Sequence, residues 1–276
     1  IVGSVLASLL MAMTGFFTDA LYLLLQRFLA GVASAAVFVS GGLLAARLGA
    51  QTPSQSGLLL GIYYGGTGWG IVLSALMVPA ALSWAQAQGV NHPWSWAWWT
   101  LAGLCLMLTI LLIVIRLPLN RWAPDAPPST MASTKSQPTG QALRQWFFAL
   151  LGYGCFGVGY IGYMTFVVAL LREQGATPTD ITLFYGLLGI AVVVSSRVWA
   201  GLLNRYRGGQ ALSILNGLLS VATLIPAMTS AWPLMMLSGL IFGVVFLSLV
   251  ASTNFAVTNG TYMSSPKSPI RPNAIT

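Results

Sequence analysis

Arg27 is the residue with the clearest chemical consequence, because it lies in an apolar stretch from about Ala20 to Leu44 in a chain with only 6% charged residues. Placing a guanidinium in hydrocarbon costs from about 3 to more than 10 kcal/mol. Arg27 follows Asp19 by eight residues, or roughly 12 Å of helix, which is too deep for the side chain to reach the outer interface easily. We therefore expect Arg27 to face a protein interior or a water-filled cavity, where it binds an anionic substrate group or assists a proton transfer. The alternative is a structural arginine that donates to backbone carbonyls of a neighbouring helix.

A second group of polar side chains lies in the glycine-rich stretch from Gly152 to Phe166. Five glycines fall within eleven residues there, which weakens an α-helix because glycine loses the most backbone entropy on folding. Weakened backbone at membrane depth is tolerated where protein or a cavity receives its polar groups. The stretch predicts a flexible, cavity-lining helix in which Gly157 and Gly159 permit movement and Tyr160 and Tyr163 supply hydroxyl groups. Tight packing alone is the alternative.

Further glycines and one amide complete the candidate site. In the segment 57–82, Gly61, Gly65 and Trp69 recur every four residues, a spacing of small groups that lets helix backbones approach closely in a membrane. Plain packing and a bendable helix that controls gating both fit this pattern. The residues assigned to packing or gating here are Gly31, which lies one turn below Arg27, and the segment's glycines Gly61, Gly65, Gly68 and Gly70. Asn254 is a further candidate polar group, near the end of the last apolar run.

Enzymatic chemistry finds no support in the sequence. The apolar runs hold no histidine and no paired carboxylates, and Cys105 and Cys155 have no nearby base to activate them as nucleophiles. No His, Cys, Asp or Glu spacing predicts a metal site, and a disulfide framework is not indicated. We expect a protein that is not an enzyme and has no metal and no cofactor.

The composition requires a lipid solvent. The chain has 276 residues, of which 57% are hydrophobic, and its mean hydropathy is +0.81. A water-soluble domain carries about 25% charged residues. Spanning structures in lipid are helices or closed barrels, and the long continuous apolar runs favour helices over strands of alternating polarity. The net charge of +8 does not indicate nucleic acid binding, because the basic residues lie at the ends of the apolar runs rather than on one polar face.

Eight apolar runs are long enough to predict an all-α membrane protein with eight transmembrane helices in two blocks of four. The chain begins inside an apolar run, so we expect a fragment of a longer protein. The predicted helices cover about 1–17, 20–48, 57–82, 94–117, 145–171, 180–203, 211–228 and 232–256. The predicted parts are a first block at 1–117, a Pro- and Ser-rich linker at 118–144, a second block at 145–257 and a disordered tail at 258–276.

The basic residues predict the orientation. With eight spans, nearly all Lys and Arg outside the spans fall on one side of the membrane, and only Arg172 falls on the other. This asymmetry places the linker and the tail in the cytoplasm. Several Trp residues gather at the opposite ends of the spans, as expected of an interfacial aromatic belt: Trp84, Trp94, Trp96, Trp98, Trp99 and Trp232.

Taken together, these features resemble the major facilitator superfamily of secondary transporters. Gln26-Arg27-Phe28-Leu29-Ala30-Gly31 is similar to the superfamily's fourth-helix motif, and the segment 57–82 is similar to its fifth helix. The stretch from Gly201 to Arg207 resembles the cytoplasmic loop motif after the eighth helix, although Asn204 stands where that motif prefers Asp. The residues assigned to this motif and to the helix before it are Arg197, Gly201, Asn204, Arg205 and Arg207.

The glycine-rich stretch in turn resembles the seventh helix of the bacterial YbfB/YjiJ-like branch, on the residues Gly157-Val158-Gly159-Tyr160 with Thr165-Phe166. The resemblance implies that the eight helices correspond to the third to tenth of twelve. It also implies a central cavity lined in part by the helices that carry Arg27, Tyr160 and Asn254.

The resulting functional hypothesis is a secondary active transporter of a bacterial inner membrane that moves a small solute by alternating access, with proton coupling as one candidate driving force. Its partners are the lipid bilayer and a small molecule of unknown identity, without nucleic acid, and we expect a monomer. The rival hypothesis is a non-transporting membrane protein, such as a receptor or an assembly scaffold. That rival explains why no Asp or Glu lies in the interior of a predicted span, but it does not explain the glycine-rich aromatic helix.

Overall fold

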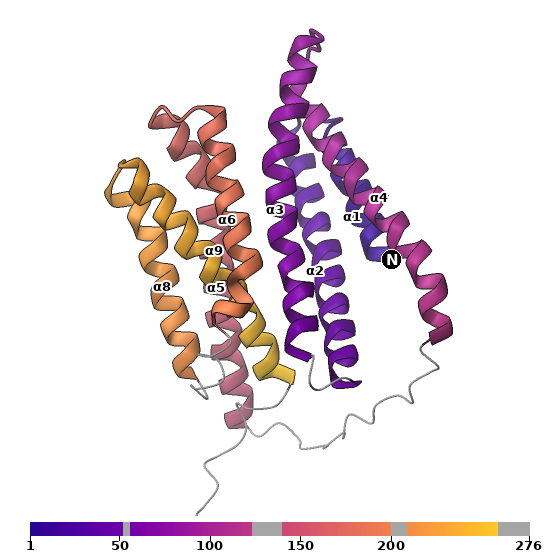
Figure 1. Ribbon diagram of the computed structural model, residues 1–276, viewed down its shortest axis with the longest axis vertical. Helices are drawn as coiled ribbons and strands as arrows, with labels where there is room; N and C mark the ends of the chain where they lie inside the picture. The colour runs from indigo at the N-terminus through magenta and orange to yellow at the C-terminus, as the bar shows by residue number, and fades with distance from the viewer. Residues whose placement is uncertain (52–55, 123–139, 200–208, 259–276) are drawn as a thin grey trace, which may run out of the picture. The chain divides into compact units, whose positions relative to one another are not determined.

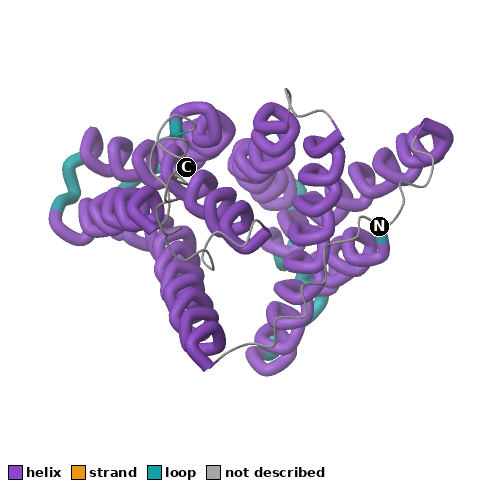
Figure 2. The backbone as a smooth tube through the Cα atoms, turned by 90° about the horizontal axis from the view of Figure 1, so that it is seen from below, coloured by secondary structure: helices purple, strands orange, loops and turns teal. Residues whose placement is uncertain are grey.

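The computed structural model describes residues 1–51, 56–122, 140–199 and 209–258, and these form eight α-helices without a strand. Figure 1 labels the helices, and Figure 2 shows that the described parts consist of helices joined by short loops. The helices are α1 (Val2–Met13), α2 (Ala20–Gln51), α3 (Ser56–Ala87), α4 (Pro93–Trp122), α5 (Gly140–Glu173), α6 (Pro178–Val198), α8 (Gly209–Met228) and α9 (Trp232–Thr258).

The prediction of an eight-helix, all-α membrane protein is confirmed. Six helices contain a span long and apolar enough to cross a bilayer, whereas α1 and α8 contribute shorter apolar segments. The boundaries differ from the predicted ones at several helices: α1 ends at Met13 rather than near residue 17, α3 continues to Ala87 rather than to about residue 82, and α6 ends at Val198 rather than near residue 203. α4 ends at Trp122 and α5 begins at Gly140, so both enter the segment 118–144, whose remainder lies outside the described residues together with the predicted tail after Thr258.

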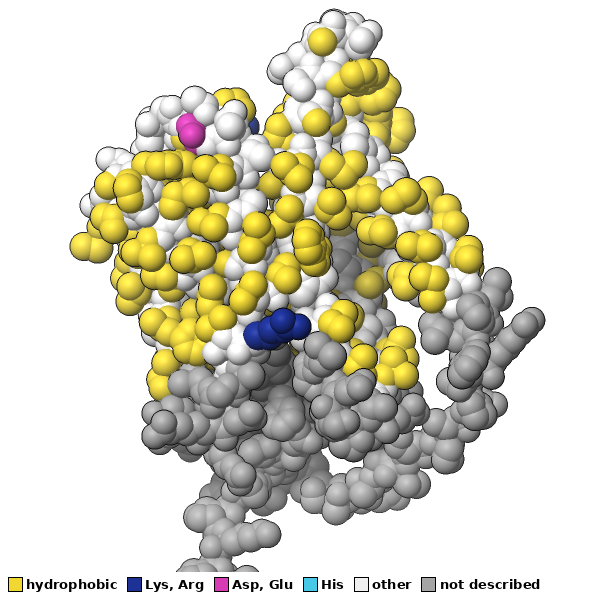
Figure 3. Space-filling view, viewed as in Figure 1, with side chains coloured by type: hydrophobic (Ala, Val, Ile, Leu, Met, Phe, Trp, Pro, Cys, Tyr) yellow, Lys and Arg dark blue, Asp and Glu magenta, His cyan; other side chains and the backbone are white. Residues whose placement is uncertain are grey.

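The surface of these helices is apolar. Large side chains such as Phe28, Val158 and Phe166 are 69%, 76% and 70% exposed. Figure 3 shows a face covered largely by hydrophobic side chains, with few charged groups among the described residues. Such a surface is unfavourable in water and favourable against acyl chains, which supports a multi-pass protein in a membrane.

Two compact units make up the chain. Unit 1 comprises Ile1–Thr134 with Gly175–Val193. In this unit α1 packs against α2 and α4, and α3 packs against α2 and α4. The Tyr63 hydroxyl of α3 donates to the Phe38 carbonyl of α2 at 2.6 Å, which adds a directional contact to the apolar packing.

Unit 2 comprises Lys135–Gln174 with Val194–Thr276, and its most extensive helix contact joins α8 to α9. Two buried hydroxyl clusters tie its helices together. In the first, Ser195 of α6 and Ser248 of α9 place their hydroxyl oxygens 2.8 Å apart, and the Ser195 hydroxyl also donates to the Val244 carbonyl. In the second, Ser238 of α9 donates to the Ala222 carbonyl of α8 at 2.6 Å. Hydroxyl groups in lipid need such partners, because water is absent.

Two of the chain's acidic residues serve as helix caps. Asp19 accepts from the backbone N–H of Tyr22 at 2.9 Å at the start of α2. At the start of α6, Asp180 accepts from the Thr177 hydroxyl at 2.7 Å, and the Asp180 N–H donates back to that hydroxyl at 3.2 Å. These reciprocal bonds satisfy donors that a helix N-terminus leaves open, so both carboxylates have a local structural role.

Candidate functional site

Arg27 lies near the start of α2 and contacts two other helices of unit 1. Its Nη2 donates to the Thr14 hydroxyl at 3.0 Å, where Thr14 directly follows the last residue of α1. Its Cζ atom lies 4.1 Å from the centroid of the Trp98 ring in α4. The hydrogen bond is to a side-chain hydroxyl rather than to the backbone carbonyls of the structural alternative, and neither contact is a carboxylate. The Arg27 side chain is otherwise exposed in the described part of the chain.

Gln26 extends this polar group and was not predicted as part of the site. The Gln26 side chain is 3% exposed, and its Nε2 donates to the Leu10 carbonyl of α1. The Thr14 hydroxyl donates to the same carbonyl at 3.3 Å. The Gln26 Oε1 atom is buried without a hydrogen-bond partner among the described residues. A glutamine beside an arginine in an apolar run was the signal that could have indicated it, since both groups are costly in lipid.

Thr14 and Trp98 were also missed as partners of Arg27. Thr14 gives no signal in the sequence, because a threonine next to a helix end is common. Trp98 was assigned to the aromatic belt by its position near the outer end of a span. Only the packing of α1, α2 and α4 brings these side chains to the guanidinium.

The glycines of α3 make one very close contact. A Cβ atom at Gly68 would lie 2.5 Å from the Gly189 carbonyl oxygen of α6, and a Cβ at Gly189 would lie 2.9 Å from the Gly68 carbonyl oxygen. Gly65 is also buried, whereas Gly70 is exposed, and no described residue outside its own turn of helix lies within 4 Å of its Cβ position. Trp69 is 57% exposed, and the very close contact lies at Gly68.

Gly31 does not show the expected close contact. Nothing in the described part of the chain lies within 4 Å of a Cβ placed there. The face of α2 that carries Arg27 is therefore open at Gly31, and no described helix packs closely against it.

The glycine-rich segment is a continuous part of α5, not an unwound stretch. Apart from the neighbouring turns of α5 itself, no atom of the described residues lies within 4 Å of a Cβ position at Gly157 or Gly159. Continuity has a physical reason, since the backbone of a span has no water to bond with and keeps its internal hydrogen bonds even where glycines lower helix propensity. The glycines therefore leave exposed surface on α5 and do not interrupt the helix.

The tyrosines of α5 differ from each other in their surroundings. Tyr163 is 8% exposed, stacks on Phe242 of α9 with ring centroids 4.2 Å apart, and shares a 2.8 Å hydrogen bond with the Ser238 hydroxyl. Tyr160 is half-buried, and its ring lies 4.9 Å from that of Phe246 of α9. Tyr163 thus has a partner inside unit 2, whereas Tyr160 is the more accessible of the two hydroxyl groups.

The remaining predicted residues lie at or beyond the edges of the described regions. Arg197 is exposed in the last turn of α6, where a cation complements the negative end of the helix dipole. Asn254 belongs to α9, but its side chain lies outside the described residues, as do Gly201, Asn204, Arg205 and Arg207.

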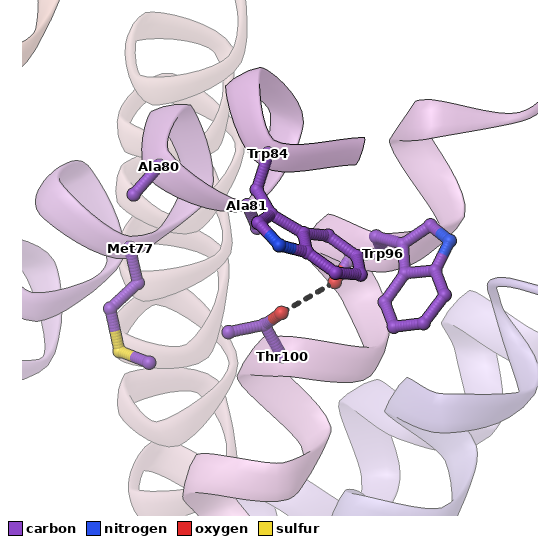
Figure 4. A pocket seen from close by; sticks show the side chains of 6 residues that line it. All are labelled: Met77, Ala80, Ala81, Trp84, Trp96 and Thr100. Carbon is purple, nitrogen blue, oxygen red and sulfur yellow. Dashed lines mark hydrogen bonds between the residues drawn. The ribbon is translucent and has the colours of Figure 1, made fainter. Parts of the chain in front are cut away.

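Two shallow cavities among the described residues lie in unit 1. One, of about 310 Å³, is bounded by α3 and α4 and is shown in Figure 4. Its lining is mainly aliphatic and aromatic, and the Thr100 hydroxyl at its wall already donates to the Trp96 carbonyl at 2.7 Å. The other, of about 370 Å³, lies beside the end of α1 and includes His92 and Trp99. Neither is lined by Arg27, Tyr160 or Tyr163.

Apolar spans, an exposed apolar surface and an arginine within a span define a polytopic α-helical membrane protein. A family model described as "Uncharacterised MFS-type transporter YbfB" matches residues 1–271, and the chain belongs to this family of the major facilitator superfamily. The comparisons with curated proteins and with solved structures gave no match. The family match confirms the resemblance seen in the sequence and indicates a transport role.

Proposed function

We propose that the protein is a secondary active transporter that moves a small solute across a bacterial inner membrane by alternating access. Membership of a transporter family supports the class of activity. Alternating access is the mechanism by which helical carriers of this kind expose one midplane site to each side in turn. The basic residues that bound the spans support a cytoplasmic location for the linker and the C-terminal tail.

Arg27 is the observation that carries this proposal. A guanidinium within the Ala20–Ala45 span, held by a hydroxyl and an aromatic face and by no carboxylate of the described residues, has a positive charge available for an anion. Retaining such a charge in lipid is costly, and a binding role for a mobile anionic group accounts for the cost. In this proposal Arg27 binds an anionic group of the substrate or stabilises a proton-transfer step.

Other residues have supporting roles in the proposal. Tyr160 and Asn254 supply polar groups along the pathway, and Tyr163 holds α5 to α9 behind them. The close contact at Gly68 supports a role for the α3 glycines in helix closure. Arg197 and the loop motif that follows it serve on the cytoplasmic side, and we propose a monomer as the working unit.

Solute uptake by the purified full-length protein in proteoliposomes tests the proposal. A defined mixture of small organic solutes is offered, and mass spectrometry identifies those accumulated above protein-free vesicles. We expect at least one solute to accumulate, and an imposed pH gradient then tests proton coupling. Wild-type uptake by both Arg27→Gln and Arg27→Lys would remove Arg27 from the mechanism. Absence of any protein-dependent uptake would favour the non-transporting alternative.

A further inference from the structure

The two contacts of Arg27 occupy different parts of its guanidinium. The guanidinium carbon lies over the face of the Trp98 ring, 4.1 Å from the ring centroid, in a cation–π contact. The Thr14 hydroxyl accepts from Nη2 at 3.0 Å, and so takes one N–H in the plane. Because a guanidinium has five N–H donors directed outward in its plane, most of the edge stays available for another acceptor.

The residues that hold the Arg27 side chain in place are hydrogen-bonded to the C-terminal end of α1. The Thr14 hydroxyl donates its own proton to the Leu10 carbonyl at 3.3 Å, which leaves its oxygen to accept from Arg27. Gln26, on the same helix as Arg27, donates to the same carbonyl. Thr14 and Gln26 therefore donate to one carbonyl oxygen, and Arg27 is joined to this pair through Thr14, which restricts the orientation of the guanidinium.

We propose that Trp98 and Thr14 position Arg27 so that its free edge binds an oxyanion through two oxygen atoms, as in a carboxylate or a phosphate group. This inference rests on the proposed function, in which Arg27 meets an anionic group, and it names the chemistry of that group and two residues that orient its receptor. Trp98 and Thr14 are positioning residues, since they touch Arg27 and not the anion.

Because the contacts of Arg27 restrict the orientation of its guanidinium, the N–H groups that stay free favour an oxyanion as their ligand. Two parallel N–H groups of arginine match two oxygens of a carboxylate or phosphate, and this paired geometry adds strength and selectivity that the point charge of lysine lacks. The cation–π contact with Trp98 holds the guanidinium in place without an oxygen acceptor, so it does not compete with an oxyanion for the N–H groups. A spherical anion such as chloride gains charge attraction only. The oxyanion can belong to a solute or to the phosphate of a lipid headgroup.

Calorimetric titration of the purified full-length protein in maltoside detergent micelles, which contain no phosphate group, tests the proposal. Benzoate and inorganic phosphate are the probes, chloride is the monatomic comparison, and nanodiscs that contain phosphatidylglycerol test a lipid source. We expect saturable binding of benzoate or phosphate but not of chloride. If phosphatidylglycerol abolishes that binding by competition, the oxyanion site is open to lipid headgroups. Absence of saturable binding of either probe in the phosphate-free micelles overturns the proposal.

Variants distinguish a positioning role of Trp98 from a general loss of folding. Trp98→Leu should weaken benzoate binding by about threefold to thirtyfold, the range expected for a lost cation–π contact, and Trp98→Phe should restore part of it. Trp84→Leu, at an exposed tryptophan of α3, is the matched control and should bind as the wild type does. Arg27→Lys should lose the preference for benzoate over chloride. Equal benzoate affinity in the wild type and Trp98→Leu, with both folded, would overturn the positioning role.

A spectroscopic measurement locates the binding event. The chain has ten Trp residues, so the difference in emission between the wild type and Trp98→Phe isolates the signal of Trp98. We expect benzoate to change this signal and Arg27→Gln to abolish the change. Transport is measured separately on the same preparations. Oxyanion binding without transport would contradict the proposed function alone, and transport with unaltered binding in Trp98→Leu would contradict this inference alone.

Discussion

Replacing Gly68 with alanine should loosen the contact between α3 and α6. The new Cβ would lie 2.5 Å from the Gly189 carbonyl oxygen, whereas ordinary van der Waals contact begins at 3.4 Å, so the backbones must separate by about 0.9 Å. The obstacle is backbone, which has no rotamer by which to move aside. Overpacking of this kind costs about 1–3 kcal/mol, which outweighs the gain of up to about 1 kcal/mol that alanine brings to a helix.

The matched control is Gly70→Ala, two residues along the same helix. Nothing lies within 4 Å of a Cβ at Gly70, so only the gain in helix propensity applies there. Thermal unfolding of both variants in the same detergent, followed by circular dichroism, measures the difference. We expect Gly68→Ala to unfold at a lower temperature than the wild type, and Gly70→Ala to unfold at the same or a slightly higher temperature.

A second substitution sharpens this test. Gly189→Ala places a Cβ 2.9 Å from the Gly68 carbonyl oxygen and 2.7 Å from the Val72 Cγ2 atom, and so forces open the same gap. Because the first alanine already separates the helices, the double variant should be less destabilised than the sum of the two single variants. Equal stability of Gly68→Ala and Gly70→Ala, or strict additivity in the double variant, would refute the reasoning.

Three further predictions concern hydroxyl groups and topology. Tyr163→Phe removes a buried hydrogen bond to α9 and should lower the free energy of unfolding by about 0.5–1.5 kcal/mol. Tyr160→Phe should alter solute uptake more than thermal stability. A larger loss of stability in Tyr160→Phe than in Tyr163→Phe would contradict their assigned roles. Ser195→Ala removes hydrogen bonds to α9, with the Val244 carbonyl and the Ser248 hydroxyl, and should cost about 1–3 kcal/mol. Ser220→Ala, which loses only a bond within α8, should be nearly neutral when the unfolding temperatures are compared. A fluorescent protein inserted in segment 118–144 should fluoresce, because this segment is expected in the cytoplasm. If that insertion does not fluoresce while an insertion in the loop joining α3 to α4 does, the proposed orientation is reversed.

The sequence by itself determined the architecture, and lipid is the physical reason. A chain with 57% hydrophobic residues in long continuous runs must form helices in a bilayer, because each span has to satisfy its backbone hydrogen bonds internally. This rule acts locally along the chain, so all eight helices could be predicted from composition and length. The boundaries of α3 were less predictable, because its last turns, Ser83–Ala87, are less apolar than its span and carry no stop signal. The helix ends at Ala87, shortly before Gly89, which adopts a φ of 66° that favours glycine.

The local sequence also indicated which residues are unusual, but not what they contact. Arg27 was predicted from its cost in hydrocarbon, whereas Thr14 and Trp98 reach it only through the packing of α1, α2 and α4. Glycine spacing predicted a close helix contact in α3, yet the contact falls at Gly68, because the crossing point with α6 is set by both helices together. Tyr160 and Tyr163 look equivalent in the sequence, and the tertiary structure separated them by giving one a buried hydroxyl partner 75 residues away. Contacts between distant segments depend on how helices pack, and that information is not contained in the periodicity of any single segment.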